Sequence, residues 1–198
     1  MADYPGDLSV REARARYFAA NNLGDGGYLD RWVKFKISVI SIWIPNTKGR
    51  VAAVRFHDLH HLVTGYDTSW KGEAEIAAWE IASGCANHYA AWFLNAVAMS
   101  IGLAIDFKLV AKAFWSGRHS GNLYRQHFDE GWLDVTVNTL RRRLGLNLAD
   151  YAPSAKDIAL FTVWAVVSLI TLVLIVFLCL LPVSMALITC YWLYRATT

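Results

Sequence analysis

The chain has 198 residues, 56% of them apolar, and a formal net charge of +3 at neutral pH. A chain of this length predicts one or at most two domains, and its apolar content excludes an intrinsically disordered protein. The charge is small and the basic residues form no long stripe, so we expect no nucleic-acid partner. The three cysteines form no CxxC pair, which argues against a disulfide framework.

The N-terminal region begins with a short acidic segment that has no apolar continuation. Because residues 1–7 are not followed by a secretory signal, we expect the N-terminal domain to lie on the cytoplasmic side of a membrane. Ser9 and Glu12 have the spacing of a capping box, which predicts a helix over residues 9–20. The Asn- and Gly-rich residues 21–27 then predict a break.

Residues 28–44 are aromatic and apolar with few charges. The 3–4 spacing of Trp32, Phe35, Lys36 and Val39 favours a helix in the first half of this segment. Residues 37–44 are rich in β-branched side chains, so helix and strand both stay open there. A turn over residues 45–49 leads into the next segment.

Three histidines and one aspartate follow within five residues, as His57, Asp58, His60 and His61. In a helix, His57 and His61 stand one turn apart on the same face, and Asp58 lies on the flank of that face. Two histidines with this spacing and an adjacent carboxylate indicate a metal site.

A second carboxylate, Glu73, follows beyond a predicted turn. Gly65 predicts the end of the first helix, and Thr68 or Ser69 predicts the start of a second one. Two antiparallel helices with a short loop between them bring Glu73 back beside the histidines. Imidazole nitrogens and carboxylate oxygens together suit zinc, iron or manganese. We therefore predict a divalent metal site formed by His57, Asp58, His61 and Glu73.

Two known sites share parts of this pattern. The run from His57 to His61 also matches the His-x-x-His-His box of membrane di-iron hydroxylases and desaturases, which need more histidines than the six in this chain. The His57-Asp58 pair is similar to that of the phosphohydrolases named for an HD dyad. Those enzymes take a further histidine from an upstream helix, and none precedes His57.

A third pattern fits better. His57, Asp58 and His61, followed by eleven residues and Glu73, resemble the signature of the Coq-four family of ubiquinone-biosynthesis proteins. The Leu-x-Thr-Gly after the second histidine and the Trp79-Glu80 pair also look like that family. The resemblance covers about residues 10–146. His60 departs from it, because an apolar or aromatic residue is expected there.

The resemblance implies a protein that binds a divalent metal through these four side chains and holds a polyprenylated quinone precursor in an apolar tunnel. It implies removal of the C1 carboxyl group of the ring and hydroxylation of that carbon, with Glu73 and Asp58 as candidate catalytic carboxylates. Glu73 is either a ligand or a proton shuttle. The alternative is a non-catalytic lipid-binding scaffold that organises other quinone-biosynthesis proteins, with or without forming a homo-oligomer.

Residues 81–105 hold no formal charge, which by length permits a transmembrane helix. Their polar residues, such as Asn87 and Asn95, suit a buried helix pair equally well. Further helices are predicted over residues 122–132 and 134–144. We expect Arg141, Arg142 and Arg143 to be exposed at the end of the last helix, where cations suit the helix dipole and anionic lipid headgroups.

Residues 158–194 contain no formal charge at all. One bilayer span needs roughly 20 residues, so this run is longer than one span. Pro182 predicts a break, and Trp164, Tyr191 and Trp192 are of the types that favour membrane interfaces. We predict an all-α fold class, with a helical bundle and a C-terminal transmembrane or re-entrant helical hairpin. The metal- and prenyl-lipid-binding domain covers residues 1–150, and a linker and membrane anchor in contact with lipid cover residues 151–198.

Overall fold

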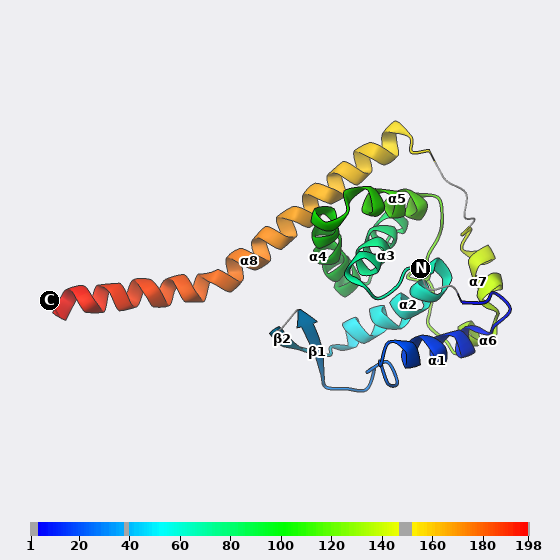
Figure 1. Cartoon of the computed structure of the whole chain (residues 1–198), viewed down its shortest axis with the longest axis horizontal. Helices are drawn as coiled ribbons and strands as arrows, with labels where there is room; N and C mark the ends of the chain where they lie inside the picture. Colours follow the sequence, from blue (N-terminus) through cyan, green and yellow to red (C-terminus); the bar gives the residue numbers. More distant parts are fainter. Residues whose placement is uncertain (1–3, 38–39, 147–151, 198) are drawn as a thin grey trace.

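The computed structural model describes residues 4–37, 40–146 and 152–197. Within these ranges the chain forms eight helices and one two-stranded hairpin (Figure 1). In chain order the elements are α1 (Val10–Ala20), β1 (Trp32–Ile37), β2 (Ile40–Pro45), α2 (Lys48–Thr64), α3 (Trp70–Ser83), α4 (Tyr89–Ile105), α5 (Phe107–Arg118), α6 (Gly131–Asp134), α7 (Val137–Arg143) and α8 (Ala155–Thr197). The mostly helical fold class with a long apolar C-terminal helix is confirmed.

Helix α3 lies at the centre of the bundle and packs against α4 and α5 (Figure 1). Ile76 and Trp79 on α3 and Phe114 on α5 are fully buried in one apolar cluster. A second cluster contains Leu59 of α2 and Leu133 of α6, together with side chains of α1 and α7. Because α2 belongs to one cluster and α3 to the other, the predicted metal-binding residues lie where the two clusters meet.

The loop between α2 and α3 reverses the chain as predicted. Gly65 ends α2 in the left-handed region, with φ of 75°, and the Ser69 side chain caps α3 by accepting a hydrogen bond from the Gly72 N–H. A Cβ atom at Gly72 would overlap the carbonyl oxygen of Asp67, so only glycine lets the first turn of α3 approach this loop so closely. The close approach directs Glu73 back towards α2.

The capping box at Ser9 and Glu12 begins α1 as predicted. The helix predicted over residues 122–132 is wrong for most of that range, because within the described chain only its end is helical, in α6. The helix predicted over residues 134–144 is present as α7 but begins later, at Val137. Val135 is extended between α6 and α7, and its carbonyl accepts a hydrogen bond of 2.9 Å from the N–H of Val10. The extended residue between α6 and α7 therefore holds the start of α1 against these two helices.

The segment after α1 forms an antiparallel hairpin, not the helix predicted from the spacing of Trp32, Phe35 and Val39. That prediction is wrong, and Val39 itself lies outside the described residues. The β-branched side chains of residues 37–44 favour extended backbone because their χ1 angles are restricted. This local preference for extended backbone outweighs the helical spacing, which only a few residues supported.

Helix α8 runs without interruption through Pro182, so the predicted helical hairpin is not formed (Figure 1). Proline removes one backbone hydrogen bond, and apolar membrane helices tolerate that loss. Among the described residues α8 is the helix that is long and apolar enough to cross a membrane. Residue 151, where the predicted linker begins, and residues 147–150 before it lie outside the described residues.

The first half of α8 packs on the bundle. The Trp164 and Trp92 rings stack with their centres 4.9 Å apart, and Asp157 pairs with Arg118 at 3.2 Å. One side of α8 stays at least partly buried as far as Ile175. Every side chain described within residues 176–195 is exposed, and we call these residues the exposed segment.

This division of α8 makes a testable difference between two tryptophans. Replacing Trp164 with Ala should destabilise the bundle by about 1–3 kcal/mol, because a stacked and partly buried aromatic contact is lost. The matched control is Trp192→Ala in the exposed segment, where the side chain is 64% exposed. This variant should leave stability unchanged. Thermal unfolding of both variants in detergent, followed by near-ultraviolet circular dichroism, measures the difference. Equal melting temperatures would contradict the packing of α8.

Candidate metal centre

Three of the four predicted ligands converge where α2 meets α3. One donor atom from each of His57, His61 and Glu73 lies within 4.8 Å of the other two. The two histidine Nε2 atoms are 3.1 Å apart. The Glu73 carboxylate oxygens lie 3.4 Å from Nε2 of His57 and 3.5 Å from Nε2 of His61.

These separations fit a divalent transition metal. Ligand bonds of about 2.0–2.1 Å place neighbouring donor atoms about 2.9–3.4 Å apart, from octahedral to tetrahedral geometry. The separation of the two histidine nitrogens falls in this range, and the two Glu73 oxygens lie at its upper edge. The His57, His61 and Glu73 group can therefore hold a metal ion without large rearrangement.

Hydrogen bonds fix which nitrogen of each histidine faces the site. Nδ1 of His61 lies 2.9 Å from the carbonyl oxygen of Tyr66, which only accepts, so Nδ1 carries the proton. Nδ1 of His57 likewise donates to Oε1 of Glu80 at 3.0 Å. With His57 neutral, each Nε2 presents a lone pair towards the other, and a metal ion between these atoms satisfies both, as in metal sites whose histidines donate to a carbonyl or carboxylate. With His57 protonated, its Nε2 instead donates a hydrogen bond to Nε2 of His61.

The charges around the triad favour a cation. Burial lowers the pKa of His57, but the carboxylates of Glu80 and Glu73 outweigh burial and hold that pKa well above its usual value. Burial raises the pKa of Glu73, yet its contacts with His57 and His61 bring that pKa below its usual range. Glu73 is therefore ionised at neutral pH, and its carboxylate attracts a cation.

Glu80, on α3, is the residue that the site prediction missed. Its carboxylate is fully buried and accepts four hydrogen bonds. Oε1 accepts from Nδ1 of His57 and, at 2.6 Å, from Nδ1 of His60. Oε2 accepts from Asn95 at 2.6 Å and from the hydroxyl of Tyr124 at 2.8 Å. Glu80 follows Glu73 by two helical turns on the same face of α3, which is the sequence signal that was available.

His60, the residue that departs from the family pattern, does not join the triad, because both of its nitrogens have other partners. Nδ1 donates to Glu80, and Nε2 accepts a hydrogen bond of 3.0 Å from the N–H of Leu123. Its side chain is fully buried, and burial lowers the pKa of His60. A neutral histidine thus connects Glu80 to the chain after α5.

Asp58 lies beside the triad but is not brought into it. Its Oδ2 accepts a hydrogen bond from the hydroxyl of Tyr28. Burial raises the pKa of Asp58, although the bond from Tyr28 and the nearby histidines act in the opposite direction. The role of Asp58 as a fourth ligand stays a prediction.

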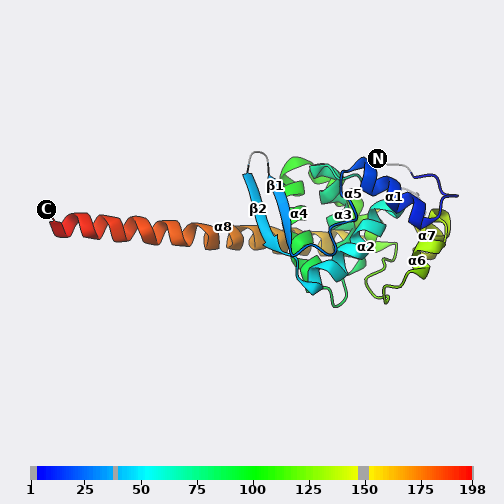
Figure 2. The same ribbon diagram turned by 90° about the horizontal axis from the view of Figure 1, so that it is seen from below.

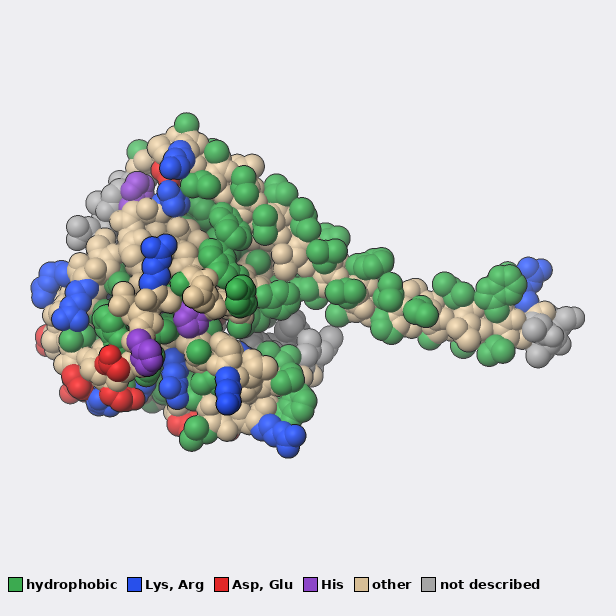
Figure 3. Space-filling view, turned by 180° about the vertical axis from the view of Figure 1, so that it is seen from behind, with side chains coloured by type: hydrophobic (Ala, Val, Ile, Leu, Met, Phe, Trp, Pro, Cys, Tyr) green, Lys and Arg blue, Asp and Glu red, His purple; other side chains and the backbone are tan. Residues whose placement is uncertain are grey.

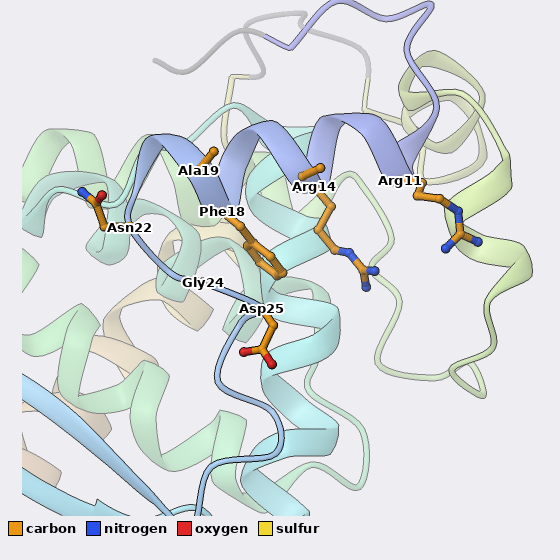
Figure 4. Close-up of a pocket in the computed structure, with 8 residues that line it drawn as sticks. Arg11, Arg14, Phe18, Ala19, Asn22, Gly24 and Asp25 are labelled. Atoms are coloured by element: carbon orange, nitrogen blue, oxygen red, sulfur yellow. The ribbon is translucent and has the colours of Figure 1, made fainter.

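A surface groove elsewhere in the structure is separate from this centre. It lies along α1 and the loop that follows, and the side chains of Arg14, Phe18 and Asp25 line it (Figure 4). Arg11 at its end pairs with Glu130 and Asp134. None of the triad residues lines this groove, so it forms no part of the metal centre.

Comparison with protein-family models, curated proteins and solved structures finds no match. The geometry of the site therefore carries the functional argument.

Replacing Glu80 with Gln should weaken zinc binding by roughly 10–100-fold, because the residue that orients a metal-binding histidine is lost. The matched control is Tyr124→Phe, which removes one hydrogen bond to the same carboxylate without touching His57. Competition of the purified protein against a chromogenic zinc chelator measures both affinities. Circular dichroism checks that each variant remains folded. Equal losses in the two variants would contradict a specific role for the contact between Glu80 and His57.

Proposed function

We propose that this chain is a membrane-anchored, metal-dependent enzyme acting on a polyprenylated quinone precursor, as its resemblance to the Coq-four family implies. The reaction replaces the C1 carboxyl group of the ring with a hydroxyl group. The carbon–carbon bond breaks and carbon dioxide leaves. Dioxygen supplies the hydroxyl oxygen, and its second oxygen atom is reduced to water with two protons and two electrons from an external two-electron reductant. The domain lies on the cytoplasmic side of the membrane in this proposal.

The observation that carries the proposal is the number of protein ligands in the centre. A structural zinc site is closed by four protein ligands, whereas a catalytic site has three and keeps a position open. Two histidines and one carboxylate with open positions are also the donor set of non-haem iron oxygenases. The group of His57, His61 and Glu73 supports chemistry at the metal more than a purely structural role.

The residues around the triad have distinct roles in this proposal. A bound divalent metal supplies Lewis-acid chemistry. Glu73 acts as a ligand, which leaves proton transfer to Asp58. Burial raises the pKa of Asp58, and the Tyr28 hydroxyl donates a hydrogen bond to its Oδ2. A carboxyl group with a raised pKa suits general acid–base catalysis near neutral pH.

The apolar C-terminal helix supports the choice of substrate. A carboxylated ring on a polyprenyl tail partitions into the bilayer, so a domain anchored by α8 meets it at a high local concentration. Helix α8 is long and apolar enough for this role. A divalent metal, membrane lipid and other quinone-biosynthesis proteins complete the proposed set of partners.

The proposal predicts that Glu73→Ala loses both metal and activity, while Glu75→Ala on the same helix keeps both. Elemental analysis of the purified proteins measures metal content. Mass spectrometry of lipids from cells that depend on this chain measures quinone and its carboxylated precursor. We expect the precursor to accumulate and the quinone to fall with Glu73→Ala only. A metal-free Glu73→Ala protein that restores full quinone synthesis at native expression would instead favour the non-catalytic scaffold.

A further inference from the structure

The β1–β2 hairpin exposes an aromatic and basic face. Trp32 and Trp43 are 49% and 59% exposed. Lys34 lies opposite Trp43 in the register, and its ammonium group is 5.8 Å from the centre of the Trp43 ring. Leu29, just before the hairpin, is 88% exposed. We call the outer side formed by Trp32, Lys34 and Trp43 the hairpin face.

The hairpin lies at the end of the bundle from which the exposed segment of α8 projects. In two perpendicular views it is the part of the bundle that reaches furthest towards that segment (Figures 1 and 2). The space-filling view shows apolar side chains at the edge of the bundle on the side from which α8 projects (Figure 3). Helix α7 lies at the opposite end of the bundle.

The length of the exposed segment determines where the surface of a bilayer would meet the protein. As a helix, residues 176–195 span about 30 Å, which equals the hydrocarbon thickness of a bilayer. The outer side of α8 is also apolar before this segment, with Val166 and Ile170 about half exposed. The bilayer boundary therefore lies at residue 176 or nearer to the bundle, close to the level of the hairpin.

The side chains of the hairpin face are of the types that favour the headgroup region at a bilayer boundary. Tryptophan favours the interface between headgroups and acyl chains, where its ring is apolar and its N–H stays hydrated. Lysine extends its ammonium group to lipid phosphates while its alkyl chain packs on apolar surface. Exposed apolar side chains gathered in this way normally mark an interaction surface.

We propose that the hairpin face rests in the headgroup layer of the bilayer that α8 crosses, and so gives the domain a second membrane contact. This inference rests on the proposed membrane anchor. A single helix leaves the bundle free to rotate and tilt on the membrane surface. Two contacts fix one orientation, and the metal centre then keeps a constant position relative to the bilayer.

Spin labels on the full-length chain test this in vesicles of phosphatidylcholine and phosphatidylglycerol. Ser41 is exposed two residues before Trp43 in β2 and is replaced with Cys, while Cys179 and Cys190 are changed to Ser. Cys85 is buried and is kept. A second protein carries the label at Cys179 in the exposed segment, and a third carries it at Arg143→Cys in α7. Relaxation by oxygen, which enriches in lipid, is compared with relaxation by a chelated nickel salt, which stays in water.

We expect oxygen to dominate at positions 179 and 41 and nickel to dominate at position 143. Adding Trp32→Ser and Trp43→Ser should raise nickel relaxation at position 41 severalfold and leave position 179 unchanged. The control Trp70→Ser, at a residue that is also 49% exposed, should change neither label.

The opposing outcomes separate this inference from the proposed anchor. If oxygen dominates at position 179 and nickel at position 41, α8 is inserted and the hairpin contact is wrong. If neither reagent reaches position 41, a second copy or another protein covers the hairpin, and the lipid contact is again wrong. If nickel dominates at position 179, the anchor itself fails, and the hairpin inference fails with it.

Discussion

The candidate metal centre depends on one buried carboxylate. Glu80 has no exposed surface, and an ionised group there is tolerated only because four donors satisfy it. Two of these donors are histidine Nδ1 atoms on α2, so the charge of Glu80 ties α2 to α3. The same contact turns Nε2 of His57 towards His61 and Glu73. A single interaction therefore serves both the packing of the two helices and the chemistry of the site.

The sequence predicted the local structure around this centre well. The i and i+4 spacing of His57 and His61, the glycine at position 65 and the cap at Ser69 depend on neighbouring residues, and such local signals are readable. The partners of Glu80 could not be predicted in the same way. Asn95 and Tyr124 reach it from α4 and from the chain after α5, and only the tertiary packing of α3 against these elements determines their positions.

The errors in the prediction have related causes. The segment from Trp32 onward has a weak helical spacing and a strong β-branched content, and the second signal decides its structure. We predicted that Pro182 would end the helix, but α8 is strongly apolar and continues through this residue. The first half of α8 also packs on the bundle, because Trp164 stacks on Trp92. The helices that carry the candidate metal centre and the apolar helix are thus parts of one packed structure.

The orientation of the two histidines is the central claim, and nitrogen NMR of the zinc-loaded protein tests it most directly. Imidazole 15N shifts distinguish a protonated nitrogen from one that binds a metal. We expect His57 and His61 each to carry a proton on Nδ1 and to bind zinc through Nε2. Zinc on Nδ1 of His57, or a proton on Nε2 of both rings at saturating zinc, would contradict the role assigned to Glu80.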